Sequence, residues 1–278
     1  MRLGIFVVPD ATDADATVAR VLAADRHGLD VVGVQDHPYQ RRYLDTWTLL
    51  SFVAARTERV RLLTDVVNLP LRLPSVLAKS AASLDRLSGG RVELGVGAGA
   101  FWDGVAAMGG PRRTPKESVD ALEEAIAILR GFWSGERSVT VAGEHYSVQG
   151  AKPGPTPAHP IGIWVGAYGP RMLRLTGRIG DGWLPSLGGS YLSREQVPAM
   201  QRAVDEGAEV AGRDPAEIER AANVTSLEGD PAGWPDQLAR VVDGLGFSTV
   251  LVGLPDEEPL EVIRRLGEET APRLRELL

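Results

Sequence analysis

An adjacent aspartate and histidine, Asp36 and His37, follow the apolar run at residues 31–34 and are the first candidates for chemistry. An isolated histidine is more often packed at a strand end and bonded to a neighbouring carbonyl. A histidine also titrates near neutral pH, so it can donate or hold a proton at a reacting centre. The place of this pair, directly after a buried strand, favours catalysis, and we predict His37 and Asp36 as catalytic residues. The remaining histidines are predicted to be structural or solvated: His27, His145 and His159.

The sequence lacks the usual residues of a metal site or a hydrolase. Cysteine is absent, no HxxxH or HxH spacing occurs, and the histidines fall on different predicted elements. We therefore expect no metal ligands. No G-x-S-x-G segment occurs either, so the nucleophile of a serine hydrolase is not predicted.

Two glycine-containing segments follow predicted strands. The segment GVGAG at residues 95–99 resembles a dinucleotide-binding loop but lacks the full G-x-G-x-x-G spacing, and close backbone packing explains it equally well. The segment GAYG at residues 166–169 precedes a helix that begins at Pro170. Free N–H groups at such a helix start can bind a phosphate, to which Arg171 and Arg174 could add charge. An ordinary capped turn is the alternative.

Aromatic side chains lie near the ends of the predicted strands. Most tryptophan and phenylalanine side chains belong to a core, but a group of them at one mouth would suit a flat heteroaromatic ligand. The members of this group are Tyr39, Tyr43, Trp47, Phe101, Trp102, Tyr168 and Trp183.

Short apolar runs alternate with helical patterns along almost the whole chain. The predicted strands are residues 3–8, 31–35, 60–68, 92–97, 161–167, 181–186, 217–227 and 248–253. The predicted helices are residues 16–28, 46–58, 74–87, 117–133, 170–180, 193–212, 234–244 and 259–277.

This alternation indicates an α/β fold with a parallel sheet, because consecutive strands joined by helices require right-handed crossovers. Eight such units in a chain of this length predict a single (β/α)8 TIM barrel over residues 1–278. A doubly wound open sheet is the alternative. Residues 137–148 are predicted to form a small β-hairpin inserted between two units.

Composition narrows the class of protein. The net charge is −7, the isoelectric point is about 5.3, and no Lys/Arg-rich run occurs, so a nucleic-acid partner is not expected. No uninterrupted apolar run is long enough to span a membrane. The absence of cysteine fits a cytoplasmic protein. A homodimer is left open.

At this point the sequence resembles the bacterial luciferase-like monooxygenase family. The resemblance covers nearly the whole chain, through the segments GLDVVGVQDHPY, RVRLLTDVVNLPLRLPSVLAKSAASLDRLSGGRVELGVGAG, IGIWVGAYGPRMLRLTGRIGDGWLP and EETAPRLREL. It implies a (β/α)8 barrel that binds a flavin or a deazaflavin at its mouth. The family includes oxidoreductases that use coenzyme F420, such as methylenetetrahydromethanopterin reductase, and flavin-dependent monooxygenases.

The resemblance also implies residue roles. His37 and Asp36 match a pair beside the reactive face of the ring in the deazaflavin branch. Asp65-Val66 falls where that branch often has a bulge with a non-proline cis peptide bond, residues 97–99 would line the ribityl chain, and residues 167–169 would offer amides to the phosphate. The full set of expected cofactor-binding residues is Asp65, Val66, Asn68, Gly97, Ala98, Gly99, Gly166, Ala167, Tyr168, Gly169 and Trp183.

One departure bears on the substrate. The sugar-phosphate dehydrogenases of this family carry an acidic residue where this chain has Ala100, which argues against a hexose phosphate and for a small, more apolar organic substrate. The loop at residues 100–115 and the hairpin at residues 137–148 are the expected specificity elements.

Three functions remain open from the sequence. The first is an F420-dependent oxidoreductase that transfers a hydride, favoured by the Asp36-His37 pair. The second is a monooxygenase that uses reduced FMN and oxygen. The third is a non-catalytic flavin-binding barrel.

Overall fold

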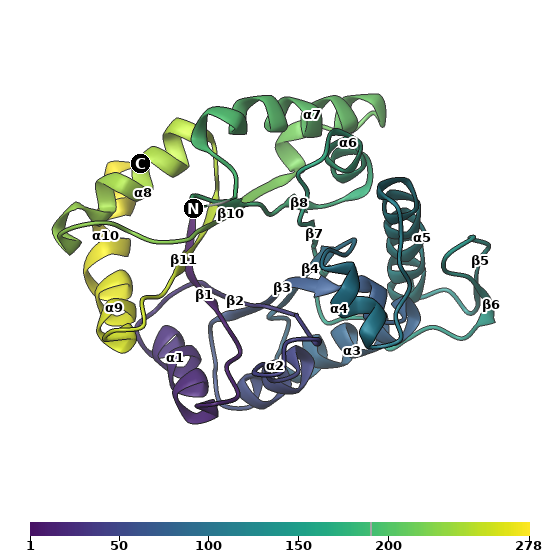
Figure 1. Ribbon diagram of the computed structural model, residues 1–278, viewed down its shortest axis with the longest axis horizontal. Helices are drawn as coiled ribbons and strands as arrows, with labels where there is room; N and C mark the ends of the chain where they lie inside the picture. The colour runs from purple at the N-terminus through teal and green to yellow at the C-terminus, as the bar shows by residue number, and fades with distance from the viewer. Residues whose placement is uncertain (190) are drawn as a thin grey trace.

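A closed barrel of parallel strands forms the centre of the computed structural model, which describes residues 1–189 and 191–278 (Figure 1). Neighbouring barrel strands pair in the order β1, β2, β3, β4, β7, β8, β10 and β11, and β11 pairs again with β1. Their bounds are β1 Arg2–Val7, β2 Val31–Val34, β3 Arg61–Asn68, β4 Val92–Gly97, β7 Ile163–Val165, β8 Gly182–Trp183, β10 Glu219–Val224 and β11 Thr249–Gly253. The short β9, Ser186–Leu187, continues the β8 segment and also pairs with β10. The predicted (β/α)8 TIM barrel is confirmed, and the open sheet is excluded by the β1–β11 pairing.

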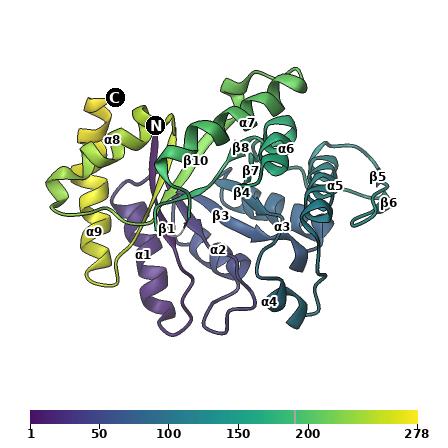
Figure 2. The same cartoon turned by 45° about the horizontal axis from the view of Figure 1, so that its top comes forward.

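Helices cover the outside of the barrel, as both views show (Figures 1 and 2). Barrel strands are enclosed on both faces, and the four residues of β2 are all buried. The α-helices are α1 Ala14–Arg26, α2 Thr46–Ala54, α3 Pro74–Leu87, α4 Trp102–Ala107, α5 Pro115–Trp133, α6 Pro170–Ile179, α7 Val197–Val210, α8 Trp234–Leu245, α9 Pro259–Arg265 and α10 Ala271–Leu277. Short 3-10 turns are η1 Leu69–Leu71, η2 Arg194–Gln196, η3 Pro215–Glu217 and η4 Pro231–Gly233.

The ends of several helices follow from capping side chains. Asp13 accepts a hydrogen bond from the amide of Ala16, which starts α1 two residues earlier than the sequence predicts. Thr114 and Glu117 form a capping box at the start of α5. The helix α2 ends at Ala54, four residues early.

Three helical segments differ from their predictions in kind. The predicted helix at residues 193–212 divides into η2 and α7. The predicted C-terminal helix contains a π-helical segment, Leu266–Thr270, between α9 and α10. The short α4 lies in a stretch that was predicted as loop, and the left-handed conformation of Phe101, at φ 51°, directs the chain into it.

The inserted hairpin consists of β5 Val139–Val141 and β6 Val148–Ala151. Its second strand begins later than predicted because residues 144–146 form a loop instead. The Glu124 carboxylate of α5 accepts hydrogen bonds from the backbone amides of Glu144, His145 and Tyr146, at 2.8 to 2.9 Å. Both views place the hairpin outside α5, away from the barrel axis (Figures 1 and 2). No helix in the described ranges is long and apolar enough to cross a membrane.

Candidate active site

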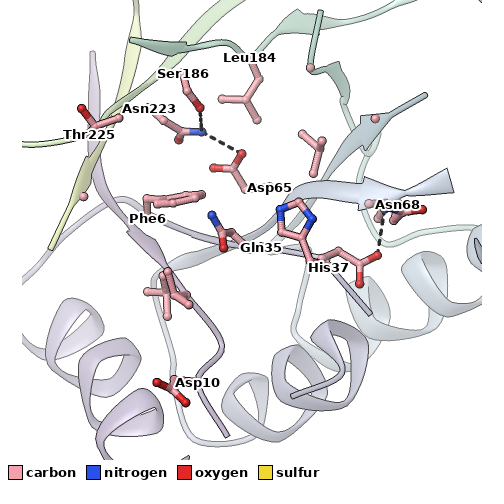
Figure 3. A pocket seen from close by; sticks show the side chains of 18 of the residues that line it. Phe6, Asp10, Gln35, His37, Asp65, Asn68, Leu184, Ser186, Asn223 and Thr225 are labelled. Carbon is pink, nitrogen blue, oxygen red and sulfur yellow. Dashed lines mark hydrogen bonds between the residues drawn. The ribbon is translucent and has the colours of Figure 1, made fainter. Parts of the chain in front are cut away.

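A cavity of about 680 Å³ opens at the carboxyl ends of the barrel strands (Figure 3). This volume is within the range of pockets that hold a cofactor or drug-sized ligand. Its lining comes from segments as distant in sequence as β1 and β11, so the barrel gathers them on one rim. The predicted site residues that line it are Asp36, His37, Asp65, Val66, Asn68, Gly97, Ala98, Gly99, Gly166 and Tyr168.

His37 is held by the phenol of Tyr39. Its Nδ1 lies 2.6 Å from the Tyr39 hydroxyl. Burial lowers the pKa of His37, against a smaller opposing effect of Asp36, so the ring is neutral at pH 7. Burial raises the pKa of Tyr39 to about 12, so the phenol keeps its proton.

The Tyr39 hydroxyl can donate its proton to Nδ1 of His37 or accept one from it. When the phenol donates, the neutral imidazole carries its own proton on Nε2. His37 is therefore a donor that can face a ligand oxygen in the pocket, or an acceptor once that proton has moved.

Asp36 lines the pocket but makes no hydrogen bond to His37 among the described residues, so its catalytic role stays a prediction. Its carboxylate accepts two hydrogen bonds from the Arg72 guanidinium, at 2.8 and 2.7 Å, and one from the backbone amide of Asn68, at 3.0 Å. The residue is 2% exposed. A carboxylate with all these partners fixes the end of β2 against the segment after β3, and its contribution is to position His37.

Asp65 lies on the floor of the pocket, in a bulge of β3. The pairing register between β3 and β4 shifts between Thr64 and Val67, and the Asp65–Val66 peptide bond is cis, as the resemblance implies. The carboxyl accepts a hydrogen bond from Nδ2 of Asn223, at 3.0 Å, and that amide also lies 3.3 Å from the Ser186 hydroxyl (Figure 3). Burial raises the pKa of Asp65 to about 7, with Asn223 opposing.

The glycines after β4 serve close packing. A Cβ on Gly97 would lie 2.7 Å from a methyl group of Val66, and a Cβ on Gly95 would lie 2.0 Å from the carbonyl oxygen of Thr64. A Cβ on Gly166 would also be only 3.2 Å from Val66. These glycines therefore leave room for the bulge, which is the packing interpretation of GVGAG. Gly99 instead has φ +109°, a conformation that favours glycine.

The predicted phosphate-binding loop at residues 166–169 has free backbone amides, but it lacks the predicted arginine charge. The first turn of α6 has Pro170 in it, and its N-cap, Gly169, makes no side-chain capping bond, so backbone N–H groups remain available. Gly169 has open space around its Cα. The two arginines do not face the loop as free cations, because Arg171 lies 3.6 Å from Asp120 and Arg174 lies 3.0 Å from Glu206.

Two predicted cofactor-binding residues have buried side chains outside the pocket lining. Trp183 is fully buried and stacks on Phe247, with ring centroids 5.7 Å apart, so its predicted contact with a ligand is wrong. Its indole donates to the carbonyl oxygen of Ala167, at 2.9 Å, and so supports the loop before α6. Ala167 is 1% exposed. A short strand inside a barrel alternates its faces, and a sequence run of apolar residues does not say which face Trp183 takes.

The aromatic group is only partly at the mouth. Tyr39, Phe101 and Tyr168 line the pocket, and the Phe101 ring meets the His37 ring edge-on, with centroids 5.8 Å apart. Trp47 belongs to the hydrophobic core. On the lining, Tyr39 and Phe101 lie on the side of β2 and β4, whereas Phe6, Tyr168 and Tyr191 come from other segments.

The remaining predictions concern the specificity elements, the other histidines and metal ligands. Among the expected specificity elements, Ala100 and Phe101 line the pocket, whereas the hairpin does not. His27 pairs with Glu268, at 2.8 Å, and His159 pairs with Asp85, at 2.8 Å. No group of three acidic or histidine side chains that could hold a metal ion occurs among the described residues.

Several pocket residues were missed by the sequence analysis. Asn223 lies in β10, the strand with the weakest sequence signal, and Gln35 and Arg20 line the pocket beside more conspicuous neighbours. An asparagine in an otherwise buried strand, as in Glu219–Val224, is the signal that could have indicated it, because buried amides need partners.

Comparisons with known proteins agree with the barrel fold. The luciferase-like monooxygenase family model matches residues 1–232. The F420-dependent glucose-6-phosphate dehydrogenase of Gordonia bronchialis is 36% identical over 288 residues, which cover 95% of this chain and 82% of the relative. The 5,10-methylenetetrahydromethanopterin reductase of Methanolobus tindarius is 35% identical over 276 residues, which cover 98% of this chain and 77% of the relative.

Solved structures show the same fold at lower identity. An F420-dependent secondary alcohol dehydrogenase in complex with an F420-acetone adduct superimposes with a TM-score of 0.84 at 19% identity, over 99% of both chains. A monooxygenase of Streptomyces bottropensis superimposes with a TM-score of 0.80 at 23% identity, over 98% of this chain and 99% of the other. Both deazaflavin and monooxygenase chemistry therefore occur on this barrel.

Proposed function

The chain belongs to the luciferase-like monooxygenase family, and from that premise we propose that it is an F420-dependent oxidoreductase. It would transfer a hydride between the deazaflavin and a small, rather apolar organic substrate. The observation that carries the proposal is the pocket that joins His37 to the Asp65–Val66 bulge, in a chain that is 36% identical to an F420-dependent dehydrogenase.

The residues present fit a ring with a phosphate-bearing tail. Val66, Leu184 and Phe6 supply apolar surface in the pocket, and buried oxygens of Asn68 and Asn223 lack hydrogen-bond partners there. The free amides at the start of α6 suit a phosphate. When bound, the deazaflavin supplies the carbon that accepts or donates the hydride.

His37 is the residue proposed to touch the substrate. Its Nε2–H can donate to an oxygen on the reacting carbon and stabilise the charge that develops there. Tyr39 keeps that proton in place from the other side of the ring, and Asp36, through Arg72, holds the strand end that carries both residues.

The lining favours an apolar substrate over a sugar phosphate. Arg20 is the only lysine or arginine on the pocket lining within the described ranges, whereas phosphate recognition usually relies on several charged or bidentate donors. Val7, Val8 and Leu254 add apolar surface on the β1 and β11 side, and Ala100 on the lining carries no charge. A cytoplasmic location and a homodimer stay predictions.

Cofactor titration tests the proposal. Purified protein is titrated separately with F420 and with FMN, each oxidised and reduced, and binding is followed by fluorescence and calorimetry. We expect F420 to bind at least about tenfold more tightly than FMN. Tight binding of FMN with no binding of F420 would assign the protein to the monooxygenase branch instead.

A variant separates catalysis from simple cofactor binding. His37→Asn should bind F420 within about threefold of the wild type but lower the hydride-transfer rate by about 10²–10⁴, the usual contribution of a positioned acid or base. A variant with unchanged rate and unchanged affinity would favour the non-catalytic barrel.

A further inference from the structure

Four buried side-chain oxygens on the pocket lining have no hydrogen-bond partner. They are Oδ2 of Asp65, Oδ1 of Asn223, Oε1 of Gln35 and Oδ1 of Asn68. Asp65 and Asn223 are 7% and 4% exposed. Oxygens of these groups accept hydrogen bonds, and buried acceptors without donors are costly. A ligand that forms hydrogen bonds with these oxygens must therefore carry N–H or O–H donors.

The amide of Asn223 has a fixed orientation. Its Nδ2 donates to Oδ1 of Asp65 at 3.0 Å, which leaves Oδ1 of Asn223 and Oδ2 of Asp65 as the open acceptors. Figure 3 shows the two side chains pointing toward each other across the pocket, from β3 and β10. Both oxygens are therefore buried acceptors on one hydrogen-bonded pair, and Oδ2 of Asp65 packs against Gly33 of β2, where an added Cβ would lie 2.6 Å from it.

Among the residues that the structure describes, no cation lies beside Asp65. Burial raises its pKa and only the Asn223 amide opposes this effect, in contrast to the guanidinium that neutralises Asp36. A buried carboxylate without a counter-ion binds a cation in preference to a neutral group.

The wider lining has an excess of acids. Asp10, Asp13 and Asp256 line the side formed by the segments after β1 and β11, where Arg20 also lines the pocket and Arg42 pairs with Asp10 at 3.4 Å. The titratable and charged groups that share the pocket with Asp65 are Asp10, Asp13, Arg20, Asp36, His37, Tyr39, Tyr168, Tyr191 and Asp256. The field at the floor therefore favours a positive ligand and disfavours an anion.

We propose that Asp65 and Asn223 form a subsite for a protonated amino group, so that the small, apolar substrate carries an amine besides the oxygen that His37 would contact. An ammonium group carries three donors and no acceptor, which matches the open oxygens. The identity of the reaction rests on the proposed function. In this proposal the side chain of Asp65 contacts the substrate, whereas the backbone bulge at Asp65 contacts the deazaflavin ring.

Small probes of matched size test this subsite directly. Butylammonium, 1-butanol and butyrate are each titrated into the protein without cofactor, and dissociation constants are measured by ligand-observed NMR. At pH 8 we expect butylammonium to bind at least about tenfold more tightly than 1-butanol, as a charge-assisted hydrogen bond requires, and butyrate to bind least. Equal affinities for butylammonium and 1-butanol would overturn the proposal.

The pH dependence provides a second measurement on the wild-type protein. Below about pH 7, where Asp65 is protonated, binding of butylammonium must displace a proton, so its affinity should rise about tenfold per pH unit from pH 5 to 7 and then level off. The affinity of 1-butanol should not follow this curve. A flat profile for butylammonium would contradict the subsite even if no variant can be made.

Asp65→Asn is the matched variant. It should remove most of the preference for butylammonium and most of its pH dependence, with any remaining slope due to His37. An equal loss of F420 and butylammonium affinity would show that the Asp65 side chain contacts the cofactor, and this would overturn the proposal. Preference for butylammonium in a protein that does not bind F420 would overturn the proposed function alone.

Discussion

Asp36 and Asp65 are both more than nine-tenths buried on the lining of one pocket, yet their surroundings differ completely. Asp36 accepts hydrogen bonds from the Arg72 guanidinium and the Asn68 backbone amide. Asp65 has only the neutral amide of Asn223, and one of its oxygens has no partner.

The difference shows that burial alone does not decide what a carboxyl does. A buried carboxylate paired with arginine is a structural anion, whereas one facing a neutral amide and a cavity keeps the ability to change its protonation state. The first group holds the histidine side of the pocket in shape, and the second is free to respond to a ligand.

Removing the cation from Asp36 should have the largest effect. Arg72→Met leaves a buried carboxylate without its counter-ion and should lower the free energy of unfolding by about 3–5 kcal/mol, measured by urea denaturation. Arg72→Lys keeps the charge and should lose less. Combining Arg72→Met with Asp36→Asn should restore part of the loss. If Arg72→Met lowers the free energy of unfolding by less than about 1 kcal/mol, Asp36 does not depend on its counter-ion and does not differ from Asp65 in this respect.

Neutralising Asp65 should instead raise the free energy of unfolding at alkaline pH. Its pKa in the folded protein, about 7, is above the usual aspartate value of 3.8. The folded state therefore binds the proton more tightly, and this contribution to stability is full below about pH 4 and lost as pH rises to 7. At pH 8, Asp65→Asn should exceed the wild type in free energy of unfolding by an amount on the order of 4 kcal/mol. Denaturation of both proteins at pH 4, 6 and 8 measures this difference, and a constant difference would count against it.

The smallest expected effect concerns the support of His37. Tyr39→Phe keeps the ring but removes the hydroxyl that lies 2.6 Å from Nδ1. The imidazole should then populate both neutral tautomers, seen in side-chain ¹⁵N NMR, and the hydride-transfer rate should fall about tenfold, the equivalent of one hydrogen bond. An unchanged NMR spectrum would show that Tyr39 does not fix the proton.

The fold and the outline of the site could be predicted from sequence because their signals are local or additive. Apolar runs and helical periodicity identify the units, and the barrel rule then places whatever follows each strand on one rim. His37 and Asp65 come together in this way, although their helices and strands are predicted separately.

The partners could not be predicted, since they depend on contacts between distant segments. Arg72 reaches Asp36 from the turn after β3, and Asn223 reaches Asp65 from β10. Adjacency in sequence suggested the wrong partner for Asp36, its neighbour His37. The burial of Trp183 against Phe247 likewise depends on the packing of β8 on the segment before β11.

The pairing of β1 with β11 has a consequence for synthesis of the chain. While the protein emerges from the ribosome, β1 can pair with β2 and β10 can pair with β8, but one edge of each stays exposed until residues 249–253 have appeared. Exposed strand edges attract other strands and chaperones. The nascent chain should therefore bind chaperones almost until translation ends. A chain stalled on the ribosome before residue 249 should form an open, aggregation-prone sheet.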